Sequence, residues 1–135
     1  MAGTPATIGQ YRIVRQIGAG RHGRTFEATR STGERVALRE IECADMRTAD
    51  RVNSDPSLQR LATIIAGLNY DALADTVEVF VVGKRVYLAE EYLEAPPLDE
   101  TLAEHRTLPM EAAWTIISRL LSGLEFGHTR GVLHM

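Results

Sequence analysis

Three glycines near the N-terminus constrain the fold of this chain more than any other feature. Gly18, Gly20 and Gly23 form a G-x-G-x-x-G motif within the stretch IGAGRHGRTFEATRSTGERVALRE. Such a motif binds a dinucleotide when it joins a strand to a helix, because the helix N-terminus then meets the pyrophosphate. Here residues 24–30 and 35–41 alternate apolar and polar side chains around the turn signal STGE, which is typical of two strands. We therefore expect the glycines to join antiparallel strands, and we reject a dinucleotide-binding fold.

The rest of the sequence predicts an α+β fold built around an antiparallel sheet. Apolar residues at helical spacing after a proline predict two helices, and the segment APPLDETLAEH turns into a shorter one. The predicted order is five strands with one helix inserted after the third strand, and then two helices. The predicted strands cover residues 11–17, 24–30, 35–41, 75–82 and 85–93, and the two longer helices cover residues 56–68 and 109–131.

Composition narrows the classes of function. The formal net charge of −3 gives no support to nucleic-acid binding, which needs a basic surface. The single cysteine, Cys43, cannot form an internal disulfide, the N-terminus has no signal-peptide pattern, and the apolar runs are too short to span a bilayer. His128 and His134 have no cysteine or carboxylate beside them to complete a metal site. We expect a cytoplasmic protein that binds no nucleic acid, no membrane and no metal.

Several segments, in the right order, resemble the bacterial-type Ser/Thr protein kinases. The stretch YRIVRQIGAGRHGRTFEATRSTGERVALREI is similar to the start of these kinases, with VALRE at the family's V-A-[IL]-K. RVYLAEEYLEAPPLDETL looks like the fifth strand, hinge and following helix, and LPMEAAWTIISRLLSGLEFGHTRGVLHM looks like the first long C-lobe helix running into H-R-D. The resemblance implies a tail over residues 1–7, a kinase N-lobe-like domain over residues 8–94, and hinge-following helices of a truncated C-lobe over residues 95–135.

The resemblance also implies where a nucleotide would bind, and where this sequence departs from the family. Arg39 stands at the position of the strand lysine that holds the ATP phosphates, and Leu61 stands at the helix glutamate that holds that lysine. Glu90 occupies the usually apolar gatekeeper position before the hinge, where an unpaired buried carboxylate is costly. We expect Glu90 either to pair with Arg39, which would plug the ATP site from within, or to turn outward. The candidate residues for binding ATP are Gly18, Gly20, Gly23, Ala37, Arg39, Glu91 and Leu93.

The sequence reaches the His of H-R-D at His134 and has Met135 in place of the Arg. It contains no catalytic aspartate, no magnesium-binding Asn and no D-F-G. We therefore expect no catalytic residue and no enzyme. The favoured interpretation is a catalytically inactive, pseudokinase-like module that acts through protein–protein interaction. The alternatives are a nucleotide-binding sensor without phosphotransfer, and the N-terminal fragment of a longer or split kinase.

The helix over residues 109–131 is expected to supply the interaction surface. Its apolar side chains fill more than one stripe at a period of 3.6 residues, so one packed face leaves other apolar faces open. Exposed apolar patches of several hundred Å² usually mark an interface. We expect the partner to be another protein or a second copy of this chain. The candidate interface residues are Trp114, Ile117, Leu120, Leu121 and Leu124.

Overall fold

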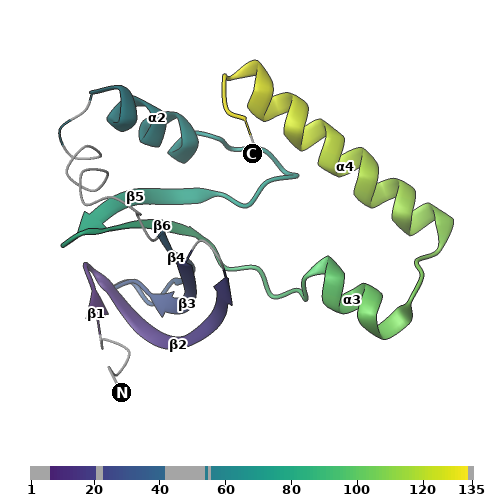
Figure 1. Cartoon of the computed structure of the whole chain (residues 1–135), viewed down its shortest axis with the longest axis horizontal. Coiled ribbons are helices and arrows are strands. Elements are labelled where there is room, and N and C mark those ends of the chain that lie inside the picture. The colour runs from purple at the N-terminus through teal and green to yellow at the C-terminus, as the bar shows by residue number, and fades with distance from the viewer. Residues whose placement is uncertain (1–6, 21–22, 42–53, 55, 134–135) are drawn as a thin grey trace. The chain divides into compact units, whose positions relative to one another are not determined.

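The computed structural model describes residues 7–20, 23–41, 54 and 56–133 (Figure 1), apart from the side chains of Ser57, Leu58 and Leu61. The chain divides into two compact units. The first comprises Met1–Asn69 and Ala74–Tyr92, and the second comprises Tyr70–Leu73 and Leu93–Met135. None of the helices within the described ranges is both long enough and apolar enough to cross a membrane.

In the described part of the first unit, six antiparallel strands form one sheet. The spatial order is β1-β2-β3-β4-β6-β5, so β4 pairs with β6 and places two segments that are distant in sequence side by side. The predicted antiparallel α+β fold is confirmed. The strands are β1 (Thr7–Ile8), β2 (Tyr11–Gly20), β3 (Gly23–Thr29), β4 (Arg35–Ile41), β5 (Thr76–Val82) and β6 (Arg85–Glu91).

The strand that the sequence did not predict is β1. It has only two residues, too few for an alternating pattern to be recognised. Gly9 has a φ of 56°, in the left-handed region that glycine adopts without strain, and this turn brings Ile8 opposite Tyr11. The predicted count of five strands is therefore wrong by this one short edge strand.

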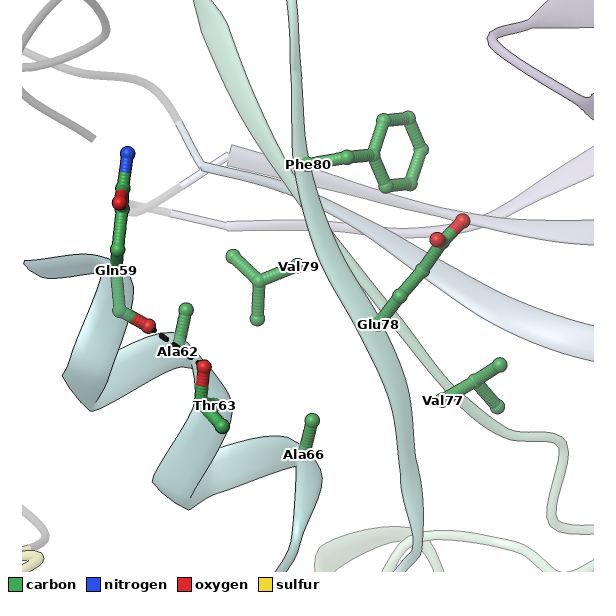
Figure 2. A pocket seen from close by; sticks show the side chains of 8 residues that line it. All are labelled: Gln59, Ala62, Thr63, Ala66, Val77, Glu78, Val79 and Phe80. Carbon is green, nitrogen blue, oxygen red and sulfur yellow. Dashed lines mark hydrogen bonds between the residues drawn. The ribbon is translucent and has the colours of Figure 1, made fainter. Parts of the chain in front are cut away.

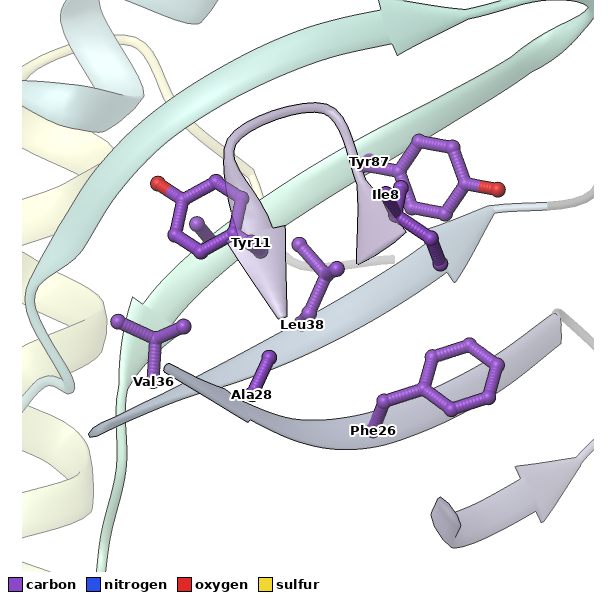
Figure 3. Close-up of a cluster of buried hydrophobic side chains, with 8 residues drawn as sticks. Ile8, Tyr11, Phe26, Ala28, Val36, Leu38 and Tyr87 are labelled. Atoms are coloured by element: carbon purple, nitrogen blue, oxygen red, sulfur yellow. The ribbon is translucent and has the colours of Figure 1, made fainter. Parts of the chain in front are cut away.

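The hydrophobic core lies on one face of the sheet, as Figure 3 shows. Alternate residues of each strand point to this face, because the side-chain period of a strand is two. The ring of Phe80 stacks between Tyr11 and Tyr87, with centroid distances of 5.4 and 5.5 Å. The buried cluster consists of Ile8, Tyr11, Phe26, Ala28, Val36, Leu38, Tyr87 and Ala89.

Helix α2 (Pro56–Ala66) lies against β5 and confirms the predicted inserted helix. Figure 2 shows Val79 pointing towards α2, whereas Phe80 points away from it towards the core. The helix presents small side chains here, Ala62 and Ala66, and a pocket of about 330 Å³ remains between helix and strand. The helix ends at Ala66, and the N–H of the next residue, Gly67, donates to the carbonyls of Thr63 and Ile64.

The second unit contains α3 (Leu98–His105) and α4 (Met110–Thr129), both as predicted. The short segment Tyr70–Leu73 packs on α4. Tyr70 stacks on Phe126 at a centroid distance of 4.5 Å, and Arg119 binds both carboxylate oxygens of Asp71 at 2.6 and 3.0 Å. Gly123 is buried where this segment crosses the helix. The absence of a side chain at Gly123 allows this close approach.

Candidate active site

The glycine motif and Arg39 line one cavity of about 310 Å³. Strand β2 ends at Gly20 and β3 begins at Gly23, and these two residues are paired. Gly23 has a φ of 133°, a conformation that residues with a side chain rarely adopt. A Cβ atom at Gly18 would meet Thr25 only at ordinary contact distance, and one at Gly20 would meet open space. The backbone geometry therefore requires glycine most clearly at Gly23.

Arg39 forms an ion pair with Glu90 across two neighbouring strands. The Nη2 atom of Arg39 lies 3.1 Å from Oε2 of Glu90. In the β4–β6 register Arg39 is opposite Leu88, and Glu90 is opposite Ala37. The two charged side chains are therefore diagonal neighbours on the same face of the sheet, a spacing that long side chains can bridge. The pairing of Glu90 with Arg39, one of the two arrangements expected from the sequence, is the one observed.

Glu40 also lines the cavity, although it was not among the candidates from the sequence. Its side chain is buried and accepts hydrogen bonds from Arg24 at 2.8 and 3.0 Å, from Arg85 at 3.2 Å and from the Tyr87 hydroxyl at 2.9 Å. Burial by itself raises the pKa of the Glu40 carboxyl, but these hydrogen bonds and the two arginine charges outweigh it and hold the pKa below its usual value. Strand parity could have revealed this residue, since it shares the buried face with Val36 and Leu38.

A second buried carboxylate, Glu27, lies on the same face of β3 as Thr25 and was also missed. Arg15 Nε and Arg35 Nε donate to its two oxygens at 2.8 and 3.0 Å. The Arg35 guanidinium stacks over the ring of Tyr92 at 4.1 Å. Burial raises the pKa of Glu27, but the two arginines outweigh this effect and lower it. Tyr92 follows the last residue of β6 and is the last residue of the first unit. This cluster therefore links the chain just after β6 to side chains of β2, β3 and β4.

The other candidates for binding ATP do not line the cavity. Ala37 is half-buried in β4, and Glu91 ends β6, where its backbone N–H donates to the Asp75 carbonyl at 2.8 Å. Leu93 is exposed and belongs to the second unit. The side chain of Leu61 and all of Met135 lie outside the described residues.

The apolar face of α4 is largely exposed. The exposed fractions are 70% for Trp114, 50% for Ile117, 60% for Leu120 and 59% for Leu121. Leu124 is half-buried, because it lies nearer to the buried side of the helix marked by Gly123 and Gly127. Four of the five candidate interface residues thus present apolar surface to solvent.

Known proteins with related sequences are serine/threonine kinases. CBL-interacting serine/threonine-protein kinase 16 of Arabidopsis thaliana is 26% identical over 126 residues, which cover 93% of this chain and 26% of the relative. CBL-interacting protein kinase 28 of Oryza sativa subsp. japonica is 28% identical over 126 residues, 28% of its length. The chain thus spans about a quarter of the length of these relatives.

These relatives overturn the expectation that the chain is not an enzyme, because they point to a family of enzymes. That expectation rested on the absence of a catalytic aspartate and of magnesium ligands from these 135 residues. Because the chain spans only about a quarter of the relatives' length, this absence does not show that the protein is not an enzyme.

Solved structures show the same fold. A point variant of the Mycobacterium tuberculosis PknI kinase domain superposes with a TM-score of 0.83 at 21% identity, over 99% of this chain and 55% of that one. Another structure of the PknI kinase domain gives a TM-score of 0.78 at 19% identity, over 95% of this chain and 52% of that one. The family model of the protein kinase domain matches residues 11–135. The chain therefore belongs to the protein kinase domain family.

Proposed function

We propose that this chain forms the nucleotide-binding part of a Ser/Thr protein kinase domain and holds ATP with its phosphates against the glycine motif of Gly18, Gly20 and Gly23. The observation that carries this proposal is the single cavity lined by Gly18, Gly20, Gly23 and Arg39. Backbone N–H groups of a glycine-rich turn and a nearby cation are the groups that bind phosphate in this family. The names of the relatives, serine/threonine-protein kinases, support the same reaction class.

Arg39 supplies the positive charge that faces the phosphates. A guanidinium is always protonated near neutral pH and offers a planar set of donors, which suits phosphate oxygens in a bidentate arrangement. It is bulkier than the ammonium of a lysine, so the phosphates would lie further from β4 than in a lysine-bearing kinase. Transfer of the γ-phosphoryl group to a Ser or Thr hydroxyl also needs a base and magnesium ligands, which the remainder of the kinase domain would supply.

Calorimetric titration of the 135-residue chain with ATP tests this proposal. Arg39→Ala should weaken ATP binding by about ten- to a hundredfold, because a charge-assisted hydrogen bond to phosphate contributes on the order of 1.5–3 kcal/mol. The matched control is Arg12→Ala, an exposed arginine on β2 that does not line the cavity. Equal ATP affinity in wild type and both variants, or no ATP binding by the wild-type chain at millimolar concentration, would refute the proposal.

A second role, protein–protein interaction through α4, is favoured by the exposure of Trp114, Ile117, Leu120 and Leu121. We propose that this face is covered by protein, either the remaining part of the kinase domain, a separate partner or a second copy. Burying each of these side chains contributes about 1.5–3 kcal/mol. Trp114 is the only tryptophan of the chain, so its fluorescence reports coverage directly. Concentration-dependent blue shift that is lost in Leu120→Ser supports self-association, and a red-shifted emission at every concentration argues against it.

A further inference from the structure

The ion pair of Arg39 differs from the one that kinases use to hold their phosphate-binding cation. In protein kinases a strand lysine pairs with a glutamate on the inserted helix, and movement of that helix makes or breaks the pair. We propose that Glu90 is instead the positioning residue for Arg39, so that the phosphate-facing cation is held by the sheet and not by α2. This inference rests on the proposed binding of ATP and assigns the control of that site.

The sheet holds the two partners in fixed register. Between them, Leu38 of β4 pairs with Ala89 of β6, and both are fully buried. Neighbouring strands in a packed core move little relative to one another, since slippage by one residue would turn the buried side chains to solvent. The 3.1 Å contact between Arg39 and Glu90 therefore depends on the same pairing that forms the core.

Glu90 lies beside Arg39 on the same face of the sheet and does not line the cavity. The cavity is lined by Arg39 but not by Glu90. The side chain of Glu90 is 18% exposed, whereas that of Arg39 is 57% exposed. The carboxylate therefore restrains the guanidinium from the neighbouring strand β6, while much of the arginine remains accessible. This geometry favours positioning over competition between Glu90 and a phosphate.

Helix α2 has no acidic side chain that could pair with Arg39 in place of Glu90. The segment PSLQRLATIIA, from Pro56 to Ala66, contains no aspartate or glutamate. Its polar residues Gln59 and Thr63 line the pocket between α2 and β5, not the cavity of the glycine motif. Displacement of α2 would thus leave the Arg39–Glu90 contact in place.

Two variants of the 135-residue chain separate the contribution of Glu90 to ATP binding from that of helix α2. Glu90→Gln removes the charge at nearly constant volume and should weaken ATP binding by about fivefold, the upper range for a partly exposed ion pair. It should leave adenosine binding unchanged, because adenosine has no phosphate. The double variant Ala62→Gly, Ala66→Gly loosens α2, since each glycine lowers helix stability by about 1 kcal/mol. It should change ATP affinity by less than about twofold and leave the NMR signal of the Arg39 guanidinium in place.

Each outcome decides the question. Selective loss of ATP affinity in Glu90→Gln, with rescue in Glu90→Asp, supports a positioning role that a purely structural effect would not reproduce. Unchanged or tighter ATP binding in Glu90→Gln overturns the inference while the proposed function stands; tighter binding would mean that Glu90 competes with the phosphates. Loss of ATP affinity on loosening α2 also overturns it. If the wild-type chain binds neither ATP nor adenosine, the proposed function fails as well.

Discussion

Replacement of Glu40 by glutamine should destabilise the first unit by about 2 kcal/mol, because hydrogen bonds to a charged group contribute about 1 kcal/mol more each than neutral ones. Glu40 accepts four hydrogen bonds, two from Arg24 and one each from Arg85 and Tyr87. The side chains of Arg24 and Arg85 are 36% and 49% exposed, so water replaces part of the hydrogen bonding that they lose in the variant. The Tyr87 hydroxyl is buried and has no such compensation.

Urea denaturation followed by circular dichroism measures this change, and thermal unfolding should show a decrease in Tm of about 8 °C for a chain of this length. The matched control is Glu34→Gln, whose carboxylate is 54% exposed and pairs with Arg30 at 3.0 Å; it should cost less than about 0.5 kcal/mol. If Glu40→Gln is no more destabilising than Glu34→Gln, the buried hydrogen-bond network does not stabilise the sheet, and the reasoning is wrong.

Three further predictions concern the pH dependence of stability, the second unit and the hydrogen bond between Tyr11 and Glu78. The pKa values of Glu27, Glu40 and Asp71 are all lowered in the folded chain. Their contribution to the free energy of unfolding is therefore fully present above the usual glutamate pKa of 4.5 and is lost as the pH falls through the folded pKa values. The unfolding free energy measured in urea should decrease below about pH 4.5, and a flat pH profile would contradict this. Gly123→Val should destabilise the second unit by about 1–3 kcal/mol, because a Cβ atom added at Gly123 would lie only 3.2 Å from Leu73 Cδ2. Ser118→Val on the exposed face of α4 is the control, and equal thermal shifts would refute the close approach. Tyr11→Phe removes the 2.7 Å hydrogen bond to Glu78 and should cost about 1 kcal/mol in urea titration; an unchanged midpoint would show that Gln10, which also donates to Glu78, compensates fully.

Much of the fold could be predicted from the sequence because its signals are local. The predictions rested on alternation in β3 and β4, on the turn between them and on helical spacing in α2 and α4. Each of these patterns involves residues only a few positions apart in the sequence. The short strand β1 was not predicted, because its two residues are too few to show an alternating pattern. Its pairing depends on the turn at Gly9, which the sequence alone did not reveal.

The candidate site could be predicted only in part. The glycine motif and Arg39 were recognised by resemblance, and the charge of Glu90 at an apolar position pointed to its partner. Strand parity places Glu40 on the buried face with Val36 and Leu38. Glu40 and Glu27 were nevertheless missed, because the sequence does not show which arginines reach them. Ala37, Glu91 and Leu93 were assigned by resemblance and do not line the cavity.

By itself, the sequence determined the type and order of the strands and helices and the chemical groups at the glycine loop, because these follow from neighbouring residues. The tertiary structure decided which charges meet. Arg24, Glu40 and Arg85 come from three different strands, and Tyr70 to Leu73 pack on α4 about fifty residues away along the chain. Such contacts depend on strand register and on close packing over a glycine, and these are properties of the assembled fold.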